Sequence, residues 1–170
     1  LQEKEETEEG IVKSNKGNSF HTKFNFLGDY SETPLADLLT PLISRAVSDY
    51  GYDAAASVSI SYWSIVTYAG GYNRRHCHPN SLISGAFYTS APEGSGELIL
   101  CDPRYGKLME TTAGRLPSHN IHQYQQVKPE TGRLVLFPSY LEHEVDESTC
   151  DDPRIIYSFN VNMLGVIKNN

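Results

Sequence analysis

From residue 57 onward the chain falls into short runs of β-branched and aromatic side chains, separated by clusters of Gly, Pro, Asn and Asp. Runs of this length and composition predict β-strands joined by turns. A chain made largely of short strands must bury one sheet against another, which favours a β-sandwich or barrel. The expected strands cover residues 57–68, 83–90, 97–100, 124–127, 133–137 and 154–163.

One stretch before these runs has a helical period instead. Between residues 33 and 50, apolar side chains recur at three- and four-residue steps and form a single stripe. Thr33 suits an N-cap, Pro34 suits the first helical position and Gly51 suits the end. Pro41 lies inside the pattern, so one kinked helix and two short helices both fit. We predict a mainly β fold with one or two covering helices.

The length and charge of the chain limit the classes of function. Its 170 residues suffice for one domain with a sizeable core. The net charge of -7 argues against nucleic acid as a partner, because phosphate binding needs clustered Lys and Arg. No apolar run reaches the length of a membrane span, so no membrane partner is expected. The Glu-rich residues 1–10 predict a disordered acidic arm, followed by one domain over residues 11–170.

Two smaller features complete the organisation of the chain. Phe20, Phe24 and Phe26 are expected to anchor one or two short strands before the helix. The three cysteines are an odd number without a CxxC pair, which is more typical of reduced thiols than of a disulfide framework. We therefore expect a cytoplasmic protein. A homodimer is one of the oligomeric states that the sequence leaves open.

Two histidines, His76 and His78, stand two residues apart just before a predicted strand. In an extended chain, residues i and i+2 face the same side, so both imidazoles point one way and Cys77 points the other. Imidazole is the commonest neutral metal ligand and suits iron, zinc, copper and nickel. Short histidine pairs also occur in solvated loops, so this pair alone leaves both interpretations open.

A third histidine, His143, follows a predicted strand and a turn, which would place it at the mouth of a sandwich or barrel. Eleven residues later, the run 154–161 alternates between an apolar face and a face that carries Arg154, Ser158 and Asn160. A helix on the apolar side and a polar cavity on the other would explain this alternation. A sheet with one solvated face is the alternative.

Short motifs follow one another in a fixed order along the chain: the His76–His78 pair, Ser84–Tyr88, Gly96–Leu98, Asp102–Arg104, Val127–Gly132, Phe137–Ser139, His143 and Arg154–Asn160. Together with Ser14–Gly17 and Trp63, their order and spacing resembles the small Fe(II)/2-oxoglutarate-dependent oxygenases. Within that family the resemblance is to short bacterial and phage members related to the prolyl 4-hydroxylases. It spans roughly residues 11–163, nearly the whole chain.

The resemblance implies a double-stranded β-helix, which is a jelly-roll sandwich with helices on one sheet, and Fe(II) at its open end. His76 and His143 match the first and last metal ligands. Most of the superfamily has Asp or Glu as the middle ligand, which completes a triad of two histidines and one carboxylate. This sequence has His78 there, and neither Asp102 nor Glu144 has the spacing of a ligand. A three-histidine iron site is therefore expected.

The resemblance also implies a binding site for 2-oxoglutarate. Arg154 matches the residue that pairs with the distal carboxylate of this cofactor, a role that suits a planar and permanently charged guanidinium. An ordinary surface arginine is the alternative. Tyr88 matches a tyrosine whose hydroxyl binds the same carboxylate. Further candidates are Ser84 and Ser158 for the cofactor, and Asn73 and Asn160 for the substrate.

The predicted function is an Fe(II)- and 2-oxoglutarate-dependent dioxygenase that hydroxylates a peptidyl side chain or a small molecule, consumes O2 and releases succinate and CO2. Two alternatives stay open. A cupin-type metalloenzyme could use three histidines without 2-oxoglutarate, but it would not need Arg154. A jelly-roll binding protein without catalysis is the other, since fold does not fix function. His119 and His122 are expected at the surface or in a lid.

Overall fold

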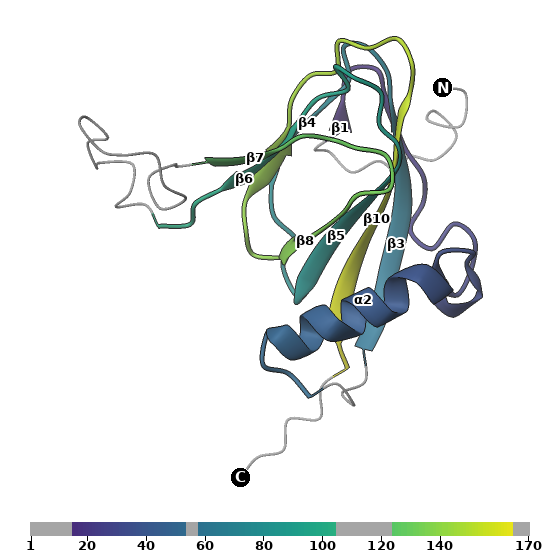
Figure 1. The fold of residues 1–170 in the computed structure, drawn as a ribbon, viewed down its shortest axis with the longest axis vertical. Coiled ribbons are helices and arrows are strands. Elements are labelled where there is room, and N and C mark those ends of the chain that lie inside the picture. Colours follow the sequence, from purple (N-terminus) through teal and green to yellow (C-terminus); the bar gives the residue numbers. More distant parts are fainter. Residues whose placement is uncertain (1–14, 54–57, 105–123, 165–170) are drawn as a thin grey trace.

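The computed structural model describes residues 15–53, 58–104 and 124–164. Within these residues the strands form two antiparallel five-stranded sheets, and an α-helix covers one of them (Figure 1). Sheet A has the shorter strands, in the order β1 (Asn15–Lys16), β4 (Tyr72–His76), β9 (His143–Val145), β6 (Leu98–Cys101) and β7 (Tyr124–Val127). Sheet B has the order β2 (Ser19–His21), β3 (Val58–Thr67), β10 (Arg154–Met163), β5 (Ile83–Ser90) and β8 (Leu134–Pro138).

The strand order confirms the predicted double-stranded β-helix. Neighbours in each sheet come from distant parts of the chain: β10 lies between β3 and β5, and β9 lies between β4 and β6. The six expected strands are all present, with ends shifted by no more than one residue. Sequence analysis did not predict β4 and β9. Phe20 lies in β2 as expected, whereas Phe24 and Phe26 lie outside the strands.

Strand β10 is the centre of sheet B, and its two faces have the predicted difference. It pairs with β3 from Arg154↔Thr67 to Met163↔Val58 and with β5 along most of its length. On one face, Phe159 and Val161 pack against the buried stripe of helix α2 (Ala36–Asp49), which consists of Leu39, Ile43 and Val47. The opposite face points between the sheets, where Ser158 and Arg154 line a cavity.

Helix α2 begins later than predicted. Its N-cap is Leu35, because the hydroxyl of Thr33 donates to the carbonyl of Tyr30 at 2.8 Å and so closes the 3₁₀ turn η2 (Tyr30–Glu32). Pro41 lies inside a helix that continues without a break, so one helix is present rather than two. The expected end is confirmed, because Gly51 follows the last turn with a φ of +84°.

Other predictions fall on residues that the structure does not describe. The acidic arm over residues 1–10 lies outside the described residues, as do His119 and His122. None of the described helices combines the length and the apolar character needed to cross a membrane. The described part of the chain thus contains the two sheets, the covering helix and the space between the sheets.

Candidate metal centre

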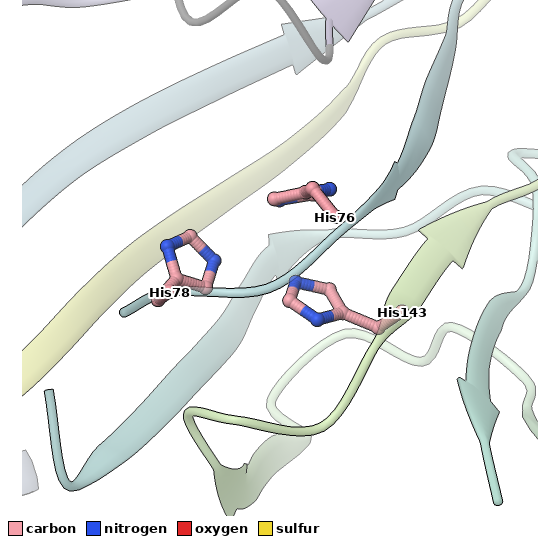
Figure 2. Close-up of side chains that lie close together, drawn as sticks. All are labelled: His76, His78 and His143. Carbon is pink, nitrogen blue, oxygen red and sulfur yellow. The ribbon is translucent and has the colours of Figure 1, made fainter. Parts of the chain in front are cut away.

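Two neighbouring strands of sheet A bring the three predicted histidines together. His76 ends β4, His143 begins β9, and the two residues are direct partners in the β4–β9 ladder. His78 follows two residues after β4, and its backbone N–H donates to the carbonyl of Ser139 at 2.9 Å. Figure 2 shows the three rings around one shared space, and one nitrogen of each ring lies within 4.8 Å of the others. This spacing allows all three imidazoles to bind one ion.

Hydrogen bonds to the backbone orient two of the rings. The Nδ1 atom of His76 lies 2.7 Å from the carbonyl oxygen of Arg74, and Nδ1 of His143 lies 2.9 Å from that of Leu141. A carbonyl can only accept, so in both rings the proton sits on Nδ1 and the lone pair of Nε2 remains free. This is the tautomer that a metal ligand needs.

Burial keeps the three rings uncharged. It lowers the pKa of His76, lowers that of His78 to about 4 and lowers that of His143 to about 3, because a charged imidazolium is poorly solvated there. The neighbouring histidines lower the pKa of His78 and His143 further. All three side chains are therefore neutral near pH 7, as metal ligands must be.

The described residues place no carboxylate in this group. Glu144, the nearest acidic residue in sequence, pairs with Arg75 through an oxygen–nitrogen distance of 3.0 Å. It alternates with His143 along β9 and so faces the other side of sheet A. The three-histidine set expected from the sequence is what the structure brings together, and its role as a ligand set remains a proposal.

Arg154 begins β10 and is among the most buried side chains, with 2% of its surface exposed. One terminal nitrogen donates to the carbonyls of Ser95 and Gly96 at 2.7 and 3.1 Å, and the other donates to the Thr67 hydroxyl at 3.2 Å. These partners are all neutral, and Nε is buried without any partner. Burial also lowers the pKa of this guanidinium. Among the described residues this buried cation has a free donor and no counter-ion, a combination that favours an anion beside it.

The histidines and Arg154 line the same cavity, which has a volume of about 360 Å³. Tyr88 joins them as the ladder partner of Ile156, and burial raises the pKa of its hydroxyl, against the opposing effect of Arg154. The cavity therefore has neutral nitrogen ligands and a cation in one enclosure. The other predicted site residues that line it are Ser84, Ser158 and Asn73.

Asn160 is the predicted site residue that does not line this cavity. Its amide nitrogen lies 3.4 Å from Nδ1 of His78, and its amide oxygen accepts from the Ser84 hydroxyl at 2.8 Å. The Ser84 and Ser139 hydroxyls are in turn 2.8 Å apart. Asn160 therefore contacts a candidate metal ligand from behind, a contact that sequence analysis did not predict.

The cavity residues that were not predicted as site residues include three with nitrogen atoms in the side chain: Asn15, His21 and Trp63. The ring of His21 stacks on Trp63 with centroids 5.6 Å apart, and Trp63 lies 5.7 Å from the ring of His78. Nε2 of His21, Nε1 of Trp63 and both amide atoms of Asn15 are buried without partners. Each needs a hydrogen-bond partner that the described residues do not supply. For Trp63, the available sequence signal was the alternation of side chains along residues 63–67, which places Trp63 and Ile65 on the same face of the strand.

The fold belongs to the jelly-roll class that many metal-dependent oxygenases share. Similar solved structures include a Pseudomonas putida prolyl-4-hydroxylase (TM-score 0.55, 16% identity, 86% of this chain and 72% of that one). Another is a Trichoplax adhaerens prolyl hydroxylase in complex with a hypoxia inducible factor peptide fragment. Its TM-score is 0.61 at 15% identity, and the match covers 90% of this chain and 66% of that one. For the carbocyclase SnoK from nogalamycin biosynthesis the TM-score is 0.59 at 15% identity, and the match covers 94% of this chain and 70% of that one. At these identities the likeness shows the fold alone.

A family comparison carries the assignment further. The family described as "Putative 2OG-Fe(II) oxygenase" matches residues 61–160, which include the three histidines and Arg154. The chain belongs to this family of 2-oxoglutarate- and Fe(II)-dependent oxygenases. A search of curated proteins gave no match to the sequence.

The residues present fit both cofactors that the family implies. Three neutral imidazoles on one side of the cavity suit Fe(II), which accepts nitrogen ligands. The unpaired Nε of Arg154 suits a carboxylate of 2-oxoglutarate, because a hydrogen bond between a guanidinium N–H and a carboxylate is assisted by both charges. The family and the three-histidine site together give Fe(II) and 2-oxoglutarate as the cofactors.

Proposed function

We propose that this chain hydroxylates an organic substrate, with His76, His78 and His143 holding Fe(II) and Arg154 holding 2-oxoglutarate. One observation carries the proposal: three neutral histidines line a single cavity together with a buried arginine that has no counter-ion within residues 15–53, 58–104 and 124–164. When bound, Fe(II) and 2-oxoglutarate supply the oxidation by O2 that hydroxylates a C–H bond and releases succinate and CO2. The protein supplies the positions of both cofactors.

The residues around Arg154 hold its guanidinium still. The carbonyls of Ser95 and Gly96 and the Thr67 hydroxyl fix both terminal nitrogens. Nε remains to face an anion, and Tyr88 adds a hydroxyl on the neighbouring strand. A carboxylate bound here neutralises the buried charge, so this end of the cavity selects a cofactor with a carboxylate at one end.

Apolar side chains keep water away from this site. Ile65, Ile156 and Phe137 line the cavity together with Leu98 and Val145, and all five are buried. A dry enclosure strengthens the pairing of Arg154 with a carboxylate and limits side reactions. The apolar lining therefore supports a cofactor site whose ionic contact is the pairing of Arg154 with a carboxylate.

The substrate is either a peptidyl side chain or a small organic molecule. Two of the similar structures are prolyl hydroxylases, one of them with a bound peptide fragment, and the third is a carbocyclase. The chain covers 66–72% of those structures in length. A reducing, cytoplasmic location also stays a prediction, supported by the free thiols of Cys77, Cys101 and Cys150.

Anaerobic titration with Fe(II), with and without 2-oxoglutarate, tests the proposal. We expect a visible charge-transfer band that needs both components and that His143→Ala abolishes. On admission of O2, and with a reductant such as ascorbate to return the iron to Fe(II), the loaded protein should slowly convert 2-oxoglutarate into succinate and CO2 without added substrate. Iron binding without any band or effect of 2-oxoglutarate would favour the cupin-type alternative. No iron binding at all would favour a binding protein.

A further inference from the structure

The third histidine is oriented differently from the other two. His76 and His143 each face a backbone carbonyl with Nδ1, which fixes the ring and its tautomer whatever side chains surround it. His78 has the side-chain amide of Asn160 at Nδ1 instead, at 3.4 Å. An amide has a donor end and an acceptor end, so it can serve either tautomer of the ring.

The amide has its donor end toward His78. Ser84 donates its hydroxyl proton to the amide oxygen of Asn160, and the amide nitrogen faces the ring. A nitrogen donor suits a ring with its proton on Nε2. Such a ring cannot bind a metal through Nε2, because that atom has no free lone pair. This arrangement therefore suits His78 only in the absence of a metal.

We propose that Asn160 positions His78 for metal binding and that the chain Ser139–Ser84–Asn160–His78 reverses its hydrogen bonds when the metal binds. A half-turn of the amide exchanges its oxygen and nitrogen in nearly the same space. The Nδ1–H group of His78 then donates to Oδ1 of Asn160, and Nδ2 of Asn160 donates to the Ser84 hydroxyl. The Ser84 hydroxyl, released from Asn160, donates to that of Ser139.

His78, Asn160 and Ser84 can make the change without losing a partner, whereas Ser139 changes from donor to acceptor toward Ser84 and must turn its own proton away. The hydroxyls of Ser84 and Ser139 are 2.8 Å apart, and a hydroxyl both donates and accepts. Both serines are buried, at 2% and 0% exposure, so water does not compete for these bonds. The ring keeps its charge, because the proton lost from Nε2 is matched by the proton gained at Nδ1. The inference rests on the proposed function, since it requires His78 to bind through Nε2.

The variant Asn160→Leu, titrated with Co(II) as a stand-in for Fe(II), tests the proposal. The wild type should show three strongly shifted, solvent-exchangeable imidazole N–H signals in its paramagnetic NMR spectrum. Asn160→Leu should lose the His78 signal alone and bind Co(II) about 10–100-fold more weakly, the usual cost of removing an outer partner of a metal ligand. Asn162→Leu is the matched control, because Asn162 lies on the same strand but bonds to Ser81.

Two more variants keep the test decisive if Asn160→Leu does not fold. Asn160→Asp retains an acceptor and should bind Co(II) at least as tightly as the wild type. Ser84→Ala removes one hydrogen bond behind Asn160 and should weaken Co(II) binding about 2–10-fold. Unchanged affinity in both Asn160→Leu and Ser84→Ala, with all three signals present, would overturn the role of Asn160, and so would weaker Co(II) binding by Asn160→Asp than by the wild type. Failure of the proposed function looks different, because the wild type itself would then lack the three signals.

Discussion

The two faces of β10 show how one strand can serve stability and chemistry at once. On the face toward α2, Phe159 and Val161 are fully buried among apolar side chains. On the opposite face, Arg154 is almost as deeply buried, yet the described part of the chain gives its Nε no partner and its charge no counter-ion. Around Phe159 and Val161 the first face is filled by apolar side chains of the protein, whereas the second face lines the cavity.

This difference shows where the stability of the fold comes from. Burial of an uncompensated charge costs free energy, while a buried aromatic side chain contributes about 1.5–3 kcal/mol. The packing of β10 on Leu39, Ile43 and Val47 therefore offsets the cost of the polar face one residue away. Substitutions on the two faces should accordingly separate into effects on unfolding and effects on cofactor binding.

The largest effect is expected from Phe159→Ala. Removal of this fully buried ring should lower the free energy of unfolding by about 3–5 kcal/mol, because the surrounding core cannot fill the space. Urea denaturation measures this loss. Phe159 also lines the cavity, but its ring offers no polar atom to a cofactor, so folded protein at low temperature should keep its affinity for 2-oxoglutarate within a few fold. A stable variant that has lost cofactor binding would contradict the separation of the two faces.

Arg154→Ala should weaken 2-oxoglutarate binding, whereas Phe159→Ala should weaken the fold. Loss of one partner of a buried ion pair costs about 3–5 kcal/mol, which corresponds to a 10²–10³-fold weaker affinity for 2-oxoglutarate. Fe(II) binding should stay near that of the wild type, and Arg154→Lys should fall between the two. Isothermal calorimetry under anaerobic conditions measures both ligands. Arg133→Ala is the control, since Arg133 bonds to Lys128 and Glu130 outside the cavity. Equal affinity in Arg154→Ala and the control would place the cofactor elsewhere.

A smaller effect is expected at Gly85, the ladder partner of Phe159 in β5. A Cβ atom there would lie 2.2 Å from Cζ of Phe159, so Gly85→Ala should destabilise the fold by about 1–3 kcal/mol through overpacking. In a double-mutant cycle with Phe159→Leu, the two losses should be less than additive, because the smaller side chain leaves room. Additive losses would show that the clash is relieved in another way.

The smallest effect is expected at Ser158, on the cavity face between Arg154 and Asn160. If its hydroxyl contacts the cofactor, Ser158→Ala removes one hydrogen bond, about 0.5–1.5 kcal/mol or 2–10-fold in 2-oxoglutarate affinity. Stability in urea should change by less than about 0.5 kcal/mol. An unchanged affinity would remove Ser158 from the cofactor site and leave the polar face with fewer functional contacts.

Sequence alone predicted β10 and its two faces because a period of two runs through residues 154–161, with Ile156 as the exception on the polar face. It did not predict β9, since a strand of three residues has no measurable period. The meeting of His76 and His143 depends on this strand, so residue patterns alone gave a weak histidine pair and an isolated histidine. The family resemblance, which spans the whole cavity, was needed to predict one site.

Contacts between distant elements explain what was missed. Asn160 reaches His78 across from β10 to the loop after β4, and no local pattern records that contact. Asn15 and His21 lie on two very short strands, where a single polar residue has no distinguishing signal. The start of α2 was misplaced because a hydroxyl such as that of Thr33 can close the preceding turn as well as cap a helix.

The pairing of His76 with His143 has a consequence for the mechanics of sheet A. An ion held by both side chains would act as a clasp between two strands that are otherwise joined by few hydrogen bonds, and whose ladder is irregular. Metal loading should therefore slow amide hydrogen exchange in β4 and β9 more than in β3 and β10, whose long ladders are already closed. The less regular sheet would then take its rigidity from the ion that it carries.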